Sequence, residues 1–109
     1  MSCGHRPAVF AAAARADLRE AVAWIARDNP AASRGLRDAA VRAAERIGAN
    51  PFVGATRPRL GADRFRFLLL AGYSYVVIYV ADAEPPRILR VLHAARDLPR
   101  ILAETGPCP

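Results

Sequence analysis

The sequence contains no lysine, and all 16 of its basic side chains are arginines. A lysine base, a lysine Schiff base and a lysine phosphate ligand are therefore excluded. Arginine binds carboxylates and phosphates through a planar fork of donors, so the net charge of +6 favours an acidic partner or a nucleic acid. GC-rich codon usage produces the same composition, and we assign it the larger share of the explanation.

Cysteines are few and long apolar runs are absent. Cys3 and Cys108 lie near opposite ends of the chain, and two such thiols do not make a disulfide framework. No stretch approaches the roughly 20 apolar residues of a membrane span. The Ala-rich start continues directly into an amphipathic pattern, unlike a signal peptide. We therefore expect a cytoplasmic protein with no membrane partner.

Length and composition predict one globular domain, residues 1–109. A chain of 109 residues with 53% hydrophobic and 24% charged residues can bury one modest core. No repeat or linker divides it. The predicted elements follow in the order strand, helix, helix and three strands. This order is typical of an α+β fold in which a helix hairpin packs on one face of a small antiparallel sheet.

The first predicted helix lies within residues 11–30. Leu18 and Val22 belong to an apolar stripe at helical spacing, which predicts a core-facing side. Asp17 falls among the charged residues of the other side, which we expect to face water. Asn29-Pro30 ends this helix and starts another, because Asn is a favoured N-cap and Pro suits the first helical position.

The second predicted helix runs from Pro30 to about Ile47. Gly48 is expected to provide its C-terminal cap, and Asn50-Pro51 prevents its continuation. Small alanines on both helices predict an antiparallel hairpin with closely spaced axes.

Strands are predicted on both sides of this hairpin. The aromatic and β-branched residues of the second half favour three strands, with a hairpin turn at Ala71-Gly72. The third is nearly all apolar, which predicts an interior position in the sheet. A short helix is expected from Asp97 onward. The predicted strands are residues 6–10, 64–70, 73–80 and 87–93, with a loop over residues 51–63.

Seven short motifs occur along the chain in a characteristic order. They are Ala14-x-x-Asp17-Leu18, Trp24-Ile25, Asn29-Pro30-Ala31-Ala32, Asn50-Pro51 with Gly54, Arg64, Tyr75-x-x-x-Tyr79 and Val91-x-His93-x-x-Arg96-Asp97. Each is weak alone, but together they resemble the RelE/ParE family of toxins from bacterial toxin-antitoxin modules. The resemblance covers about residues 9–102, and its last motif is most similar to the ParE branch.

The resemblance implies a type II toxin that a cognate antitoxin neutralises. RelE-like members cut mRNA on the ribosome, whereas ParE-like members inhibit DNA gyrase and are not known as nucleases. In both branches the toxin meets operator DNA only through the antitoxin complex. We expect a ParE-like gyrase inhibitor of the plasmid-stabilisation type, with no cofactor and no metal. The alternative is a RelE-like endoribonuclease.

Four residues are candidates for a nuclease site. RNA cleavage needs stabilisation of the phosphate charge and proton transfer, which the resemblance would assign to Arg64, Arg66, Arg96 and His93. The position after Tyr75, where RelE-like members carry a catalytic Arg, is here Val76. An apolar residue there argues against cleavage.

Local structural roles compete with catalysis in the last motif. His93 has a pKa range suited to acid-base work. We favour a local hydrogen bond that orders the turn after the strand. Arg96 and Asp97 are expected to form an ion pair, with Asp97 as a helix N-cap.

Six residues are candidates for partner binding. Trp24 lies one step from the apolar stripe, so we expect it to be half-buried, although its large ring also suits an interface anchor. Arg57 and Arg59 lie in a Pro-containing loop, where exposed arginines suit an acidic surface, although they may equally be solvated. Tyr73, Tyr75 and Tyr79 share one sheet face. That face either stacks on bases or antitoxin, or packs on the helix hairpin, and we slightly favour packing.

Overall fold

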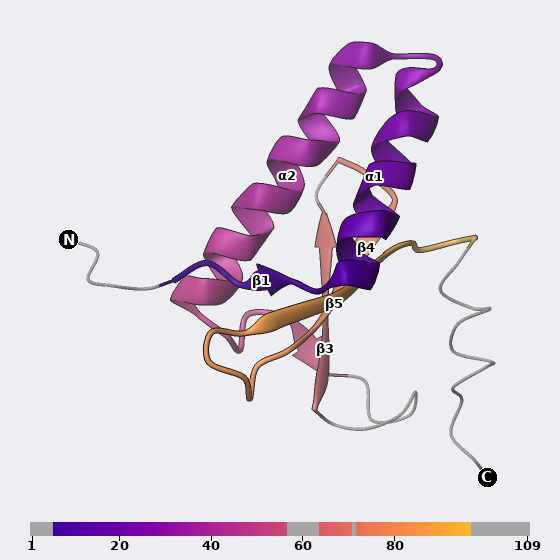
Figure 1. Ribbon diagram of the computed structural model, residues 1–109. Helices are drawn as coiled ribbons and strands as arrows, with labels where there is room; N and C mark the ends of the chain where they lie inside the picture. Colours follow the sequence, from indigo (N-terminus) through magenta and orange to yellow (C-terminus); the bar gives the residue numbers. More distant parts are fainter. Residues whose placement is uncertain (1–5, 57–63, 71, 97–109) are drawn as a thin grey trace, which may run out of the picture.

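The fold combines a helical hairpin with a five-stranded sheet (Figure 1). This computed structural model describes residues 6–56, 64–70 and 72–96. The predicted helix from Asp97, together with Arg57 and Arg59, lies outside these residues. The elements are β1 (Val9–Phe10), α1 (Ala12–Ala26), α2 (Pro30–Ala49), β2 (Ala55–Thr56), β3 (Phe65–Leu70), β4 (Tyr75–Val80) and β5 (Arg87–His93). The α+β architecture is as predicted.

The helical hairpin turns at the residues that the sequence indicated. Asn29 is the N-cap of α2, and its side-chain oxygen accepts a hydrogen bond from the Ala32 N–H at 3.1 Å. Pro30 occupies the first helical position, where its missing N–H leaves no intrahelical bond unmade. The far end of the hairpin extends past the sheet in Figure 1.

The predicted role of Gly48 as a C-terminal cap is wrong. Helix α2 continues through Gly48 to Ala49, and Asn50 is its C-cap. A Cβ at position 48 would collide with the carbonyl of Arg6, because the segment that leads into β1 crosses the last turns of α2. The Ala8 N–H donates to the Ala44 carbonyl at 2.9 Å along the same crossing. Gly48 therefore permits a close backbone approach.

The sheet has the strand order β1-β5-β4-β3-β2. Strands β3, β4 and β5 form the predicted antiparallel meander, and Gly72 turns the first hairpin with φ 85°. The N-terminal strand is shorter than predicted and pairs with β5 in parallel, so the sheet is mixed rather than wholly antiparallel. Part of the predicted loop forms β2, which pairs with β3.

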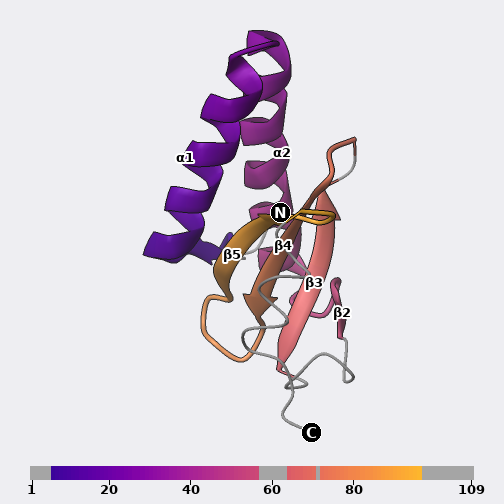
Figure 2. The ribbon, with the colours of Figure 1, turned by 90° about the vertical axis from the view of Figure 1, so that its right-hand side faces the viewer.

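Both helices cover one face of the sheet (Figure 2). Every residue of the central strand β4 is buried, and β5 takes the interior position that its apolar sequence predicted. Buried alanines line both helices, which lets α1 and α2 approach each other and the sheet. The largest fully buried side chains are Tyr79, Leu36, Ile47, Ile88, Val77 and Val91.

A β-bulge interrupts the pairing of β4 with β5. Ile78 pairs with Arg90, but the next residue, Tyr79, pairs with Ile88, so Leu89 is an extra residue in β5. A bulge bends its strand and redirects the neighbouring side chains. Ile88 and Val91 both reach the helix-facing core, although strict alternation would place them on opposite faces.

A second apolar cluster lies on the sheet face away from the helices. Val76, Ile78 and Leu92 are buried in it, and Phe65 and Phe67 pack against them. Both faces of β4 therefore carry apolar side chains. None of the helices in the described ranges is long and apolar enough to cross a membrane.

Candidate functional site

A groove of about 330 Å³ runs between α1 and β5, and we call it the α1–β5 groove. Its α1 residues are spaced at i, i+3, i+4 and i+7, which places them on one flank of that helix. The sheet supplies the opposite wall, and the segment after β5 closes one end. The lining residues are Asp17, Glu20, Ala21, Trp24, Tyr75, Val91 and Arg96.

Asp17 forms the base of this groove and clamps α1 to β5. Its Oδ2 accepts hydrogen bonds from Arg90 Nε at 2.7 Å and from the Val91 N–H at 3.0 Å. Its Oδ1 accepts from Arg90 Nη2 at 3.0 Å, so the guanidinium binds the carboxylate through two nitrogens. The side chains of Arg90 and Asp17 are 37% and 14% exposed.

The expectation that Asp17 faces water is therefore wrong. Arg90 lies next to the β5 bulge, and its guanidinium reaches the Asp17 flank of α1. The sequence carried one signal for this pair. Arg90 stands inside an otherwise apolar strand, and a partly buried charge needs a partner.

Trp24 lies at the rim of the groove and is 57% exposed, so the expected half-buried position is wrong. It sits in the last turn of α1. That turn lies towards the far end of the hairpin (Figure 1). The Arg27 guanidinium lies 5.0 Å from the centroid of its ring, within cation–π range. Trp24 therefore presents a large aromatic surface beside a cation.

His93 takes the local structural role that we favoured. Its Nδ1 accepts a hydrogen bond from the Arg96 backbone N–H at 3.0 Å, which orders the turn after β5. Its ring meets Tyr75 edge-on, with the centroids 5.2 Å apart. Tyr75 itself is buried and lines the groove. The expected ion pair and cap at Asp97 lie outside the described residues.

Arg66 lies at the other end of the sheet from His93. Arg66 pairs with Tyr79, whereas His93 pairs with Tyr75, four residues earlier on β4. At about 3.3 Å per residue this separation is about 13 Å along the strand alone. Arg66 Nη1 donates to the Gly54 carbonyl at 2.7 Å, and its guanidinium stacks 4.9 Å from the Phe52 ring centroid.

Arg64 also lies away from the α1–β5 groove, just before β3. It is exposed and forms an ion pair of 3.4 Å with Asp82, which is exposed as well. Exposed pairs of this kind contribute little to stability. The four nuclease candidates therefore divide into two groups: Arg64 and Arg66 at one end of the sheet, and His93 and Arg96 at the other.

Tyr79 is fully buried and joins β4 to the segment after α2. Its hydroxyl donates to the Pro51 carbonyl at 2.7 Å and accepts from the Gly54 N–H at 2.8 Å. A Cβ at Gly54 would lie 2.8 Å from the Tyr79 ring, so this contact requires glycine. Burial raises the pKa of Tyr79, and the Gly54 hydrogen bond and the charges of Arg66 and Arg46 act in the opposite direction.

The tyrosine face packs on the helices, as we slightly favoured. Tyr75 and Tyr79 belong to the helix-facing core, and Tyr73 is half-buried against it. The Tyr73 hydroxyl donates to the Ala32 carbonyl on α2 at 3.3 Å. Tyr79 has no exposed ring to stack on a base or an antitoxin, because the helices already cover it.

Among residues 6–56, 64–70 and 72–96, no group of three or more His, Cys, Asp or Glu side chains is placed to hold a metal ion. The groove contains the Asp17 carboxylate, whose charge Arg90 neutralises. Around it lie the exposed Trp24 indole, the Glu20 carboxylate and Arg96. Such a surface suits recognition of another macromolecule.

The arrangement of helices and strands matches a solved structure. The match is a chain of the chromosomal ParDE toxin-antitoxin system from P. aeruginosa, with a TM-score of 0.67, and the sequences are 18% identical. The alignment covers 83% of this chain and 98% of the other. At this identity the likeness establishes the α+β fold alone.

The family follows from the sequence itself. The family model of the ParE toxin of the type II toxin-antitoxin system parDE matches residues 8–98. The chain therefore belongs to the ParE toxin family, as its motifs predicted. No curated protein matches it.

Proposed function

We propose that this ParE-family toxin inhibits DNA gyrase by binding to it, without catalysing a reaction, and that a cognate antitoxin neutralises it. Membership of the ParE family supports a toxin with an antitoxin partner. The choice of gyrase over the ribosome rests on the placement of the candidate nuclease residues.

The division of those residues is the observation that carries the proposal. Arg66 binds the Gly54 carbonyl and stacks on Phe52 at one end of the sheet, whereas His93 accepts a backbone hydrogen bond at the other. RNA cleavage needs its acid, base and phosphate ligands around one scissile bond. About 13 Å along β4 is too far for one phosphate to contact both ends.

The environment of Val76 supports the same conclusion. Val76 is buried between Ile78 and Leu92 in the second apolar cluster. An arginine at this position would need a charged or polar neighbour, and the described side chains around it are apolar. The place where RelE-like members hold a catalytic arginine is therefore unsuited to a phosphate.

We propose Trp24 as an anchor for the gyrase target. Aromatic side chains dominate the binding energy of many protein interfaces, and Trp24 is exposed at the rim of a groove. Arg96 lines the same groove. The other candidate partner residues, Arg57 and Arg59, stay predictions.

Two parallel assays on purified toxin test the function. Supercoiling of relaxed plasmid by gyrase and integrity of mRNA in a translating extract are measured with the same protein. We expect inhibited supercoiling and intact transcripts, and addition of the cognate antitoxin should restore supercoiling. Cut transcripts with unimpaired gyrase would contradict the proposal and favour the ribonuclease.

A matched pair of variants sharpens the test. Arg66→Ala and His93→Ala remove one candidate from each end of the sheet. A gyrase inhibitor should keep its activity in the His93→Ala variant if folding and antitoxin binding are retained. A nuclease that uses His93 as acid or base should lose transcript cleavage by about 100-fold or more.

A further inference from the structure

The α1 wall of the α1–β5 groove carries two exposed side chains, Glu20 and Trp24. They are four residues apart, so they lie next to each other along the helix. Asp17, one turn before Glu20, differs from both because Arg90 and the Val91 N–H already bind its carboxylate. Glu20 and Trp24 are therefore the part of this wall that a partner can contact.

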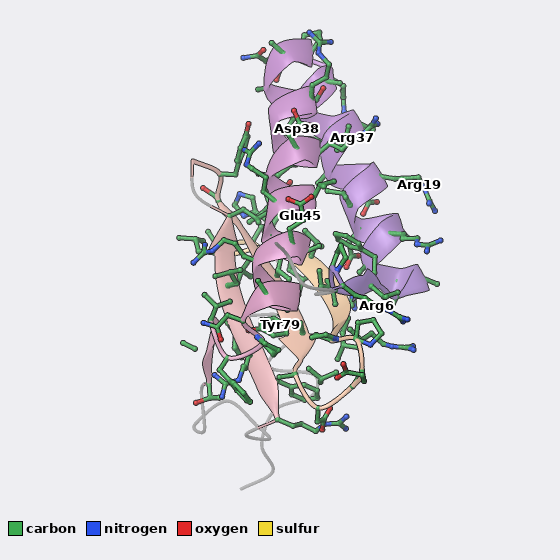
Figure 3. The ribbon with its side chains drawn as sticks, turned by 90° about the vertical axis from the view of Figure 1, so that its left-hand side faces the viewer. Arg6, Arg19, Arg37, Asp38, Glu45 and Tyr79 are labelled. Carbon is green, nitrogen blue, oxygen red and sulfur yellow. The ribbon has the colours of Figure 1, made fainter. Side chains whose placement is uncertain are left out.

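The Glu20 carboxylate forms no ion pair or hydrogen bond within residues 6–56, 64–70 and 72–96. The four positions that adjoin it on the helix surface offer no cation. They are Ala16, Asp17, Ala23 and Trp24. Arg19 directly precedes Glu20 but points away from the hairpin in Figure 3. Although the chain has 16 arginines, none in the described part neutralises this carboxylate.

The Trp24 ring is a surface that attracts cations. The faces of an aromatic ring are electron-rich, and tryptophan gives the strongest cation–π attraction of the aromatic residues. The Arg27 guanidinium already lies 5.0 Å from the ring centroid. Arg27 does not line the groove, whereas Trp24 does, so the part of the ring that lines the groove is available to a second cation.

A carboxylate and an indole at this spacing are complementary to the side chain of an arginine or a lysine. The charged head would pair with Glu20, and the aliphatic stem would lie along Trp24 and the sheet wall. Tyr75 and Val91 line that wall and are buried. The groove volume of about 330 Å³ lies at the lower end of the range for small-ligand pockets, about 300–1,000 Å³, and suits one inserted side chain.

The charge of the rest of the chain limits where such a cation can lie. The net charge is +6, and Arg96 also lines the groove. Both disfavour a basic group at a distance, so the attraction has to come from contacts inside the groove. Of the two described carboxylates that line it, Arg90 neutralises Asp17 and leaves Glu20. The cation is therefore expected beside Glu20.

We propose that Glu20 and Trp24 bind a basic side chain of the target in the α1–β5 groove. The assignment of that side chain to gyrase rests on the function proposed above. Glu20 then determines the specificity of the groove beside the Trp24 anchor, and the group that it selects is a guanidinium or an ammonium.

Trp24 is the only tryptophan of the chain, so tryptophan fluorescence reports on this one ring. Purified toxin is titrated with N-acetyl-arginine amide and, separately, with N-acetyl-citrulline amide, which has nearly the same shape and no charge. We expect the arginine derivative to change the fluorescence at concentrations about fivefold or more below those of the citrulline derivative. Glu20→Gln should remove most of that difference.

Glu45 provides the matched control. It is exposed on α2 (Figure 3) and does not line the groove, so Glu45→Gln removes the same charge elsewhere on the surface. We expect this variant to distinguish the two derivatives as wild type does. Urea unfolding of both variants verifies that neither has lost its fold.

The supercoiling assay tests whether the side chain belongs to gyrase. Glu20→Gln should weaken gyrase inhibition about fivefold or more, and Glu20→Arg should weaken it further because it adds like-charge repulsion. Glu45→Gln and Glu45→Arg should inhibit as wild type does. The affinity of each variant for the cognate antitoxin is measured by calorimetry in parallel.

Each contrary outcome is distinguishable. Equal titrations by the two derivatives, or an arginine response that Glu20→Gln retains, would overturn the proposal whatever the supercoiling assay shows. A Glu20→Gln toxin that inhibits gyrase fully but binds antitoxin weakly would overturn it in favour of the antitoxin. Wild-type toxin that selects arginine through Glu20 but leaves supercoiling unimpaired would defeat the proposed gyrase function and not the chemistry of the groove.

Discussion

At the scale of single residues, the motifs behind the family resemblance are contacts that hold the fold together. Pro51 and Gly54 belong to one motif and Tyr79 to another, yet one phenol hydroxyl joins all three. Asp17 and Val91 also come from separate motifs and meet in one hydrogen bond. The side chains of Tyr79 and Asp17 are required because they supply the hydroxyl and the carboxylate of these contacts. Glycine is required at position 54 because a Cβ there would lie against the Tyr79 ring.

The Tyr79 hydroxyl is expected to stabilise the fold measurably. Tyr79→Phe leaves the buried Gly54 N–H without its partner, and a group of this kind costs about 1–3 kcal/mol. Urea unfolding of the variant measures the loss. Tyr73→Phe is the control, because its half-buried hydroxyl makes one longer bond and should cost less. Equal losses in the two variants would contradict the assignment.

The raised pKa of Tyr79 predicts a pH dependence of stability. Burial is the main cause, so the folded state holds the phenol proton more tightly than the unfolded chain, whose value is near 10.0. Above that pH the unfolded state loses its proton first, and the free energy of unfolding falls as pH rises through the folded pKa. Wild-type protein should show this alkaline loss from about pH 10, and Tyr79→Phe should lack the Tyr79 contribution to it.

At the scale of elements, α1 and β5 are joined by the pair of Asp17 with Arg90. Asp17→Ala leaves a partly buried guanidinium and the Val91 N–H without their carboxylate. We expect a loss of about 2 kcal/mol in urea unfolding, less than for a fully buried pair because Arg90 is 37% exposed. Asp38→Ala, an exposed change on α2, should alter stability by less than about 0.5 kcal/mol.

The segment before β1 crosses the last turns of α2 and reverses the usual effect of replacing a helical glycine. In a helix interior Gly→Ala ordinarily stabilises by about 1 kcal/mol. At Gly48 the new Cβ would collide with the Arg6 backbone carbonyl, so Gly48→Ala should destabilise by about 1–3 kcal/mol. At Gly35 the Cβ meets the Tyr73 hydroxyl, the movable end of a side chain. Thermal melts should therefore show a smaller loss, or none, for Gly35→Ala.

At the scale of the whole molecule, α1 separates two surfaces of different chemistry. The α1–β5 groove combines Trp24 and Glu20 with the neutralised Asp17. A hollow on the other flank of α1 combines apolar residues with three arginines, Arg15, Arg19 and Arg37. Side chains one residue apart on a helix point about 100° apart, so the two stripes of α1 face different sides. Two partners could therefore contact the same helix without sharing residues.

Trp24 provides the prediction at this scale. Trp24→Ala should leave the free energy of unfolding within about 0.5 kcal/mol of wild type, because the ring is 57% exposed. It should weaken gyrase inhibition about tenfold or more if the ring anchors the target. Val41→Ala, another exposed apolar change, is the control in the supercoiling assay. Unchanged inhibition by Trp24→Ala would remove the α1–β5 groove from the target surface.

Both helices and the three strands of the meander were predictable from the sequence alone, whereas β2 was not. The helical stripes, the Asn29-Pro30 junction and the turn at Gly72 are local signals, because periodicity and capping depend on neighbouring residues. The ordered motifs identified the family, and His93 was correctly assigned to a local hydrogen bond. A signal of this kind can be interpreted without knowledge of the fold, because the residues that cause it lie within a few positions of one another.

Only the tertiary structure decided which residues meet. Asp17 faces β5, where Arg90 and the Val91 N–H bind its carboxylate, and Gly48 is needed because a distant segment crosses α2. Trp24 lies one step from the apolar stripe of α1 and is exposed at the groove it lines. Helical spacing assigned Leu18 and Val22 to the core, and both pack against it, but part of each side chain stays exposed beside Phe10. Spacing places a side chain on a face of its own element, but the packing of the other elements determines what covers that face.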